Sequence, residues 1–431
     1  MKNTLSLGLE HILFALFIII WLFCSLLYIP LFFLVGLFTL SLLYPGKKTY
    51  WALVLSISLI FSLMSISINP MGNNIGDVVV YYNAFINKDF IDTLLNLKIY
   101  RFLIFQLQYI FDLPVKVYSL ISISLIYILY SIFYFNFLKV FSVYVKTFKD
   151  KVFFLLVLLS SIPFFIFSSF ENTLSFVFFA NGFLCYLNRK KLSCYALFLL
   201  SFLTHGSSVI LAIIFILSTK VRNISLSLLF ILSSIMLLFI YFFSFISAYV
   251  EIPFVGFYFL RLNYYLTGPW SSYIGLLEYF LFLIALFKMF ILSVFIKDLK
   301  LRARNDSHII ILKFFFFYLT FCLLFISSRT LNLRYIYIGF LIILPYAFIY
   351  LQSNTRVLYR KVIIYSYFTL SIFSLHNIYY FYGIMKVSSF APEKGVFSSV
   401  VDFVSSDFDL PEGRYIIQSR TERVESSQKS N

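Results

Sequence analysis

Two titratable side chains in this sequence lie where acid–base chemistry could occur. His205 interrupts the apolar run SFLTHGSSVILAIIFIL, residues 201–217, and Asp77 follows Gly76 in NPMGNNIGDVVVYYNAF. A histidine with an ordinary pKa near ~6.5 can take a proton from a hydroxyl group, and a carboxylate competes for the same role. The alternatives are a histidine bonded to a neighbouring helix and an aspartate that caps a helix.

Four arginines form a second candidate set, because a guanidinium group binds phosphate through two parallel donors. Arg329 and Arg334 are the only charges in SSRTLNLRYIYIGF, and Arg261 lies in EIPFVGFYFLRLNYYLTGPWSSY. Arg101 lies in LKIYRFLIFQLQYIFDLP, which has the apolar spacing of a helix at a membrane interface. These side chains are candidates to bind a pyrophosphate group, or else they anchor the chain among lipid head groups.

Aromatic residues near these charges are suited to binding sugar rings. Tyr81 and Tyr82 come one helical turn after Asp77, and Trp270 lies among tyrosines in the second long loop. Stacking on a sugar and membership of an aromatic belt are both consistent with this pattern. Glu171, in SSFENTLSF, is a further acidic residue expected on the same side of the chain.

Metal chemistry is not expected from this sequence, and no cofactor is predicted. The loops that carry the candidate residues contain no Asp-x-Asp motif and no pair of histidines at ligand spacing. The four cysteines all lie in apolar runs without a CxxC pair. They are Cys24, Cys185, Cys194 and Cys322.

The composition sets the class of protein, since 61% of the 431 residues are hydrophobic and 12% are charged. Soluble domains carry about 25% charged residues, so we expect an all-α, polytopic integral membrane protein. With about 20 apolar residues for each span, the chain has room for about 11 to 14 transmembrane helices. Breaks at Pro30 and at His205-Gly206 divide short segments that form hairpins, kinked helices or re-entrant elements.

The apolar segments that this prediction rests on alternate with polar loops along the chain. They are residues 10–28, 30–44, 51–69, 117–138, 152–169, 173–188, 192–204, 206–218, 224–247, 273–296, 308–327, 335–351 and 362–383. Residues 1–383 therefore form the membrane domain, and residues 384–431 form a soluble C-terminal tail without a span.

Basic residues set the orientation of these segments, because lysine and arginine gather in cytoplasmic loops. Loops 139–151, 189–191 and 297–306 are rich in them, whereas basic and acidic residues balance in the long loops 70–116 and 248–272. The first group is therefore predicted to be cytoplasmic and the second to be on the outer side. The net charge of +16 follows from this topology, so no nucleic-acid partner is expected.

Three stretches resemble the Wzy-type and EpsG-like polymerases of bacterial surface polysaccharides. They are GDVVVYYNAF, NGFLCYLNRKKLSCYALFLLSFLTHGSS and RTLNLRYIYIGF. The resemblance implies a GT-C-like, metal-independent glycosyltransferase in the bacterial inner membrane, acting at its outer (periplasmic) face. Its substrates would be oligosaccharide repeat units carried on undecaprenyl pyrophosphate, which it would join into O-antigen or a related polysaccharide. A protein that regulates chain length is a possible further partner.

The resemblance assigns roles to individual residues. Asp77 matches the first outer-loop acid of the family, His205 its membrane-edge histidine, and Arg334 or Arg329 its late arginine. The family usually has an arginine at the start of the helix before the dibasic turn, where this chain has Glu171.

That departure leaves two interpretations. Arg261 or Arg101 supplies the missing contact, or this chain binds the lipid pyrophosphate differently. Three other functions also fit the composition: a flippase for the same lipid-linked units, an O-antigen ligase, and a membrane acyltransferase that pairs Glu171 with His205. The flippase is disfavoured because the chain has no self-similar halves.

The charge pattern predicts the topology directly. Reporter fusions at Lys191 and Arg304 should report a cytoplasmic location, and fusions near Asp77 and Arg261 should report the outer side. A cytoplasmic Asp77 would overturn both the orientation and the proposed position of the candidate site.

Overall fold

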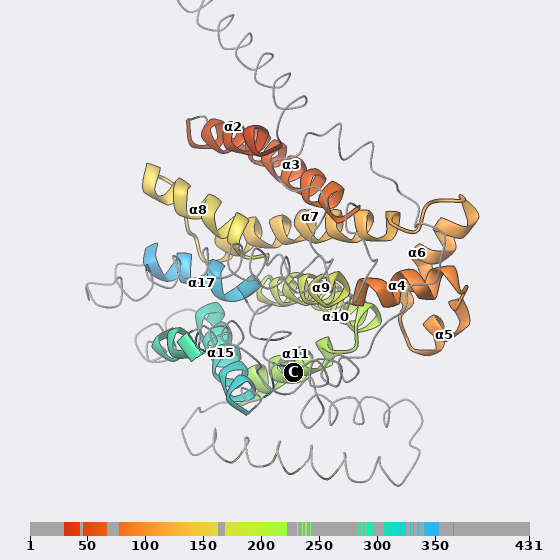
Figure 1. Ribbon diagram of the computed structural model, residues 1–431. Coiled ribbons are helices and arrows are strands. Elements are labelled where there is room, and N and C mark those ends of the chain that lie inside the picture. Colours follow the sequence, from red (N-terminus) through yellow and green to blue (C-terminus); the bar gives the residue numbers. More distant parts are fainter. Residues whose placement is uncertain are drawn as a thin grey trace, which may run out of the picture.

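The computed structural model describes the chain in several stretches. They are residues 30–43, 46–66, 77–162, 169–221, 231, 235, 238, 242, 283, 286–287, 289–295, 306–324, 328, 331, 335, 340–352 and 365. Every regular secondary-structure element within these residues is a helix, so the predicted all-α class is confirmed for this part of the chain (Figure 1). The segment at 10–28, the loop 248–272 and the tail 384–431 lie outside the described residues.

The helices divide into long ones that run side by side and three short ones at one end of the molecule (Figure 1). The short ones are α4 (Asp77–Ile86), α5 (Phe90–Leu95) and α6 (Ile99–Ile110). The longer ones are α2 (Pro30–Leu43), α3 (Lys47–Ile66), α7 (Val117–Val140), α8 (Phe148–Ser160), α9 (Phe170–Leu187), α10 (Lys191–Thr204), α11 (Ser208–Lys220), α15 (Asp306–Leu324) and α17 (Phe340–Gln352).

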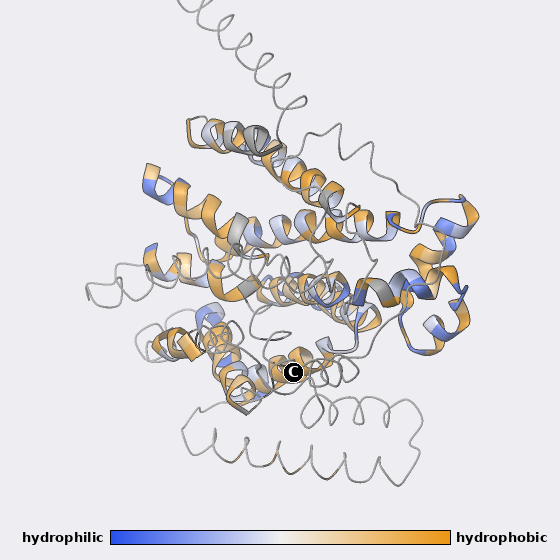
Figure 2. Cartoon of the chain, in the orientation of Figure 1, coloured by the Kyte–Doolittle hydropathy of each residue, from blue (hydrophilic) through white to orange (hydrophobic). Residues whose placement is uncertain are grey.

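Two of the described helices, α7 and α15, have the length and apolar composition of a membrane span. Three of the other described helices, α10, α11 and α17, are apolar but shorter. Figure 2 shows hydrophobic residues along most of the helices, with hydrophilic residues gathered at helix ends and around α4. The finer prediction of about 11 to 14 spans and a GT-C-like arrangement stays a prediction.

Helix α7 forms the centre of the core, with α3 packed on one side of it and α9 on the other (Figure 1). Its side chains Tyr130, Phe133 and Tyr134 are fully buried. Serine hydroxyls let the helices approach closely, since the Oγ atoms of Ser62 on α3 and Ser124 on α7 lie 2.7 Å apart. The core therefore combines large aromatic rings with small polar side chains.

The start of α8 joins two other helices at the end of the bundle away from α4. Thr147 and Asp150 form a capping box, in which each side chain accepts a hydrogen bond from the backbone of the other. The Asp150 carboxylate also accepts a hydrogen bond from Gln352 of α17 at 2.5 Å. Lys151 donates to the carbonyl of Leu42, at the end of α2, at 3.1 Å. One helix start thus satisfies polar groups from three helices.

Helices α9, α10 and α11 carry the histidine block. A tight turn through Arg189, whose φ is 61°, joins α9 to α10, and α10 ends at His205, whose backbone is extended with φ −155° and ψ 121°. The predicted break at His205-Gly206 is confirmed, because α10 and α11 are separate helices. Gly182 of α9 faces α10 so closely that a Cβ atom there would lie 2.7 Å from the ring of Phe198.

This close approach predicts that Gly182→Val will destabilise the protein by about 1 to 3 kcal/mol, because the added methyl groups overfill the α9–α10 contact. Thermal unfolding in detergent measures the loss. The same substitution should cost less in a Phe198→Leu background, where the opposing ring is gone. Equal losses in both backgrounds would contradict the packing described here.

Candidate functional site

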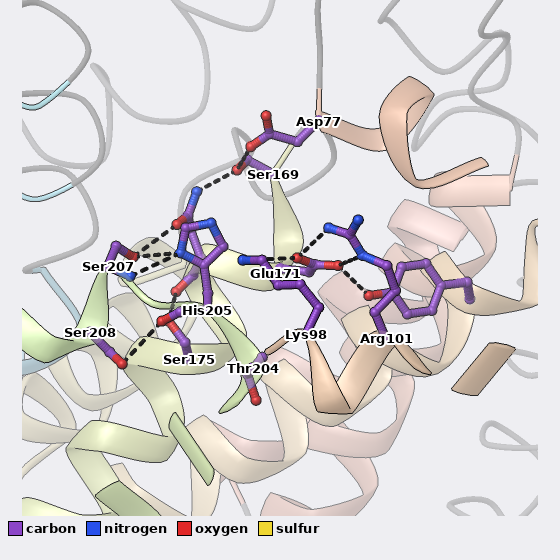
Figure 3. A network of polar contacts seen from close by, with 12 residues as sticks. Asp77, Lys98, Arg101, Ser169, Glu171, Ser175, Thr204, His205, Ser207 and Ser208 are labelled. Carbon is purple, nitrogen blue, oxygen red and sulfur yellow. Dashed lines mark hydrogen bonds and ion pairs between the residues drawn. The ribbon is translucent and has the colours of Figure 1, made fainter. Parts of the chain in front are cut away.

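The candidate site lies where the first residues of α4 and α9 meet the junction between α10 and α11 (Figure 3). Asp77 is the first residue of α4, and Ser169 directly precedes α9. His205 and Ser207 lie in the connection between α10 and α11. Three segments that are distant in the sequence therefore bring polar side chains together.

A chain of hydrogen bonds, named here the polar chain, joins His205 to Asp77 (Figure 3). The Nδ1 atom of His205 lies 2.7 Å from the hydroxyl of Ser207, which donates to Oδ1 of Asn172 at 3.1 Å. The Nδ2 atom of Asn172 donates to the hydroxyl of Ser169 at 2.7 Å. Ser169 donates to the Asp77 carboxylate at 2.5 Å. The two candidate bases are thus parts of one network.

The backbone around His205 is fixed from both sides. Its N–H donates to the carbonyl of Ser201 at 3.1 Å, and its own carbonyl accepts from the Ser208 hydroxyl at 3.1 Å. The Ser201 hydroxyl in turn donates to the carbonyl of Ser175 on α9 at 2.6 Å. Because α10 is held on α9 in this way, the imidazole is positioned by backbone contacts as well as by its ring nitrogen.

Tyr335 brings a fourth sequence segment to the site. Its hydroxyl donates to the carbonyl of Ser207 at 2.9 Å, and its side chain is 2% exposed. The hydroxyl of Tyr318 on α15 donates to the Tyr335 carbonyl. The late segment RTLNLRYIYIGF, which contains Arg334, therefore reaches the histidine turn through this tyrosine.

A buried ion pair lies beside the polar chain on the same turn of α9 (Figure 3). The Arg101 guanidinium donates to both Glu171 oxygens, at 2.6 and 2.8 Å. Tyr118 donates to the same carboxylate at 2.5 Å, and the Lys98 ammonium lies 4.0 Å away. The Glu171 side chain is 0% exposed and that of Arg101 is 11% exposed. Such a bidentate, charge-assisted pair holds both side chains in one geometry.

Electrostatics keep the Arg101 guanidinium charged. Burial alone disfavours a charged guanidinium, but attraction to the Glu171 carboxylate and hydrogen bonds to it raise the pKa of Arg101 above its ordinary value. The guanidinium also lies over the ring of Tyr81, 4.3 Å from the ring centroid, which adds a cation–π contact. Arg101 therefore sits beside the first turn of α9 and fastens α6 to it.

The two tyrosines after Asp77 are buried rather than open to solvent. Tyr81 is 3% exposed and packs edge-on against Phe170. Tyr82 is 0% exposed, and its hydroxyl lies 2.5 Å from that of Ser119. In this structure both rings hold α4 against the core instead of presenting a surface for a sugar.

The remaining predicted site residues, Arg261, Trp270, Arg329 and Arg334, lie outside the described residues. Within the described ranges no group of three or more His, Cys, Asp and Glu side chains could hold a metal ion. A cavity of about 20 Å³ lies between α9, α11, α15 and α17, and phenylalanine and aliphatic side chains and one tyrosine side chain, Tyr318, line it. None of the side chains of the polar chain lines this cavity.

Sequence reasoning missed the residues that complete the network, which are Ser169, Asn172, Ser207 and Tyr335. The two serines directly precede helices, where such residues normally cap the backbone. Neither side chain makes a capping hydrogen bond here, because both hydroxyls are used in the polar chain. The sequence alone does not show that these two serines lack a capping role, so it could not assign them to the polar chain.

The site combines a carboxylate and an imidazole in one hydrogen-bonded network, next to a buried pair of opposite charges. Such a set can accept a proton and stabilise the resulting cation. Comparison with protein-family models, with curated proteins and with solved structures finds no match for this chain.

The ion pair predicts a large effect of single substitutions. Glu171→Leu should lower the free energy of unfolding by about 3 to 5 kcal/mol, because it leaves the Arg101 guanidinium buried without its partner. The double variant Arg101→Leu/Glu171→Leu should recover much of that loss. Thermal unfolding measures both, with Asp92→Leu on the exposed face of α5 as the control. A Glu171→Leu variant as stable as this control would show that the pair contributes little.

Proposed function

We propose that this chain is a multi-pass glycosyltransferase of the bacterial inner membrane that polymerises oligosaccharide repeat units carried on undecaprenyl pyrophosphate. One observation carries the proposal. The three stretches that resemble Wzy-type polymerases each supply a residue to one network: Asp77, the His205–Ser207 turn and Tyr335. Unrelated surface loops would have no reason to converge through partly buried hydrogen bonds.

The length of α10 supports a site in the outer half of the bilayer. Helix α10 has 14 residues, so it is about 21 Å long at 1.5 Å per residue. The hydrocarbon core is about 30 Å thick. With the basic end of α10 at Lys191 in the cytoplasmic head groups, His205 lies in the outer half of the bilayer, where bulk water is scarce and lipid-linked substrates arrive.

The proposed reaction is a direct displacement at the anomeric carbon of the donor sugar. A base takes the proton from the acceptor hydroxyl, and the new carbon–oxygen bond forms as the bond to pyrophosphate breaks. The lipid pyrophosphate leaves with the electron pair, and cationic donors stabilise its charge. Either His205 or Asp77 is the base, since the polar chain joins them.

We assign the pyrophosphate-binding role to Arg329 and Arg334, which precede Tyr335 in the segment that reaches the site through this tyrosine. Arg101 already holds both oxygens of Glu171, so its role is to fasten α6 to α9. Arg261 and Trp270 belong to the second outer loop and are candidates for contacts with the sugar units and the lipid pyrophosphate.

The proposal predicts that His205→Gln will insert normally but leave repeat units unpolymerised. Loss of a general base typically lowers the rate by about 10²- to 10⁴-fold, whereas loss of a structural hydrogen bond mainly lowers stability. The readout is the length distribution of the surface glycan in cells that lack the native gene. His308→Gln is the matched control, because His308 contacts Tyr346 elsewhere in the bundle.

A His205→Gln variant that makes normal-length polymer would overturn the assignment of His205. Accumulation of single repeat units attached to the final acceptor would indicate polymerase loss, whereas absence of any attached unit would indicate a ligase. Unflipped units retained on the cytoplasmic side would indicate a flippase.

A further inference from the structure

The direction of each hydrogen bond in the polar chain can be deduced from its Asp77 end. An ionised carboxylate only accepts hydrogen bonds, so the single hydroxyl proton of Ser169 points to Asp77 at 2.5 Å. The Ser169 oxygen must then act as the acceptor for Asn172, 2.7 Å away. The amide group of Asn172 is therefore oriented with its NH₂ toward Ser169 and its oxygen toward Ser207.

The same logic continues to the imidazole. The amide oxygen of Asn172 can only accept, so the single hydroxyl proton of Ser207 is donated to it at 3.1 Å. The Ser207 oxygen then faces Nδ1 of His205, 2.7 Å away, as an acceptor. For this contact to be a hydrogen bond, Nδ1 must carry the proton of the neutral ring.

One contact favours the opposite tautomer. The backbone N–H of Ser207 lies 3.3 Å from Nδ1 and would need a lone pair there. That contact, at 3.3 Å, is longer than the 2.7 Å contact to the hydroxyl. The amide orientation, fixed from the Asp77 end, decides in favour of a protonated Nδ1.

We propose that Asn172 is a positioning residue that fixes neutral His205 in the tautomer with the proton on Nδ1. The ring then presents Nε2 as its proton acceptor, so His205 is the base and Asp77 is the anchor of the chain. This role as base rests on the proposed function, whereas the tautomer does not. Each hydrogen bond points from the imidazole toward the carboxylate, so the chain favours the imidazolium that forms when Nε2 takes a proton.

Asn172 transmits polarisation and not protons, because an amide would have to become an imidic acid to relay a proton. The proton from the acceptor hydroxyl therefore stays on Nε2 until solvent or the departing pyrophosphate removes it. Asp77 keeps its negative charge throughout the step. Its contribution is orientation and electrostatic stabilisation over the length of the chain.

The test is ¹⁵N NMR of the full chain, labelled with ¹⁵N-histidine and reconstituted in lipid nanodiscs without substrate. The chain has four histidines, and the His205 signals are those that disappear in His205→Gln. At a pH where the ring is neutral, we expect Nδ1 to be protonated and Nε2 unprotonated. A ring protonated on Nε2 in the native chain would overturn the proposal.

Variants test whether Asn172 causes this state. Asn172→Ala should shift His205 toward the Nε2-protonated tautomer, and Ser169→Ala, a smaller change, should produce a mixture because the amide can then turn over. Asn181→Ala is the matched control on the same helix. The Asn181 amide donates to the backbone carbonyls of Leu129 and Val177 and is not part of the polar chain. Unchanged His205 signals in folded Ser169→Ala and Asn172→Ala would also overturn the proposal.

The NMR experiment tests the tautomer and the polymer assay tests the base role, so either claim can be overturned without the other. A native Nδ1-protonated ring together with normal polymer from His205→Gln would remove the base role and leave the tautomer standing. An Nε2-protonated ring together with loss of polymer in His205→Gln would leave the proposed function standing and remove Asn172 from it.

Discussion

The buried first turn of α9 is the constraint on which the site depends. Glu171 and Asn172 are both 0% exposed, and an unpaired carboxylate or amide there would cost several kcal/mol. Each side chain therefore recruits partners from another part of the sequence, Glu171 from α6 and Asn172 from the turn after α10. Helices α4, α6, α10 and α11 are positioned around one helix start because its polar groups must be satisfied.

The two side chains belong to two different kinds of polar contact. The Arg101–Glu171 pair is fully engaged within the protein, because both carboxylate oxygens accept hydrogen bonds and the guanidinium is almost buried. The polar chain from Asp77 to His205 is directional, and one of its ends is an imidazole that is partly exposed. A rigid ion pair next to a hydrogen-bonded network is an arrangement that holds the imidazole in place.

Much of the helical framework could be predicted from sequence, because apolar runs of span length are strong signals. Helix α7 was expected at 117–138 and is Val117–Val140, and the break at His205 was expected from its polar neighbours. The contact of Arg101 with Glu171 could not be predicted, since 70 positions separate them and several cations were available. The burial of Tyr82 could not be predicted, because the sequence of a helix does not indicate which other segment packs against each of its faces.

The proposed function requires Asp77 and His205 to act as one unit through the polar chain. The most direct test is a double-mutant cycle on the polymerisation rate, with Asp77→Asn, His205→Gln and the double variant, each corrected for the amount of folded protein in the membrane. The account predicts strong non-additivity, in which the double variant is hardly slower than His205→Gln alone. Rate losses that multiply, as for independent residues, would contradict it.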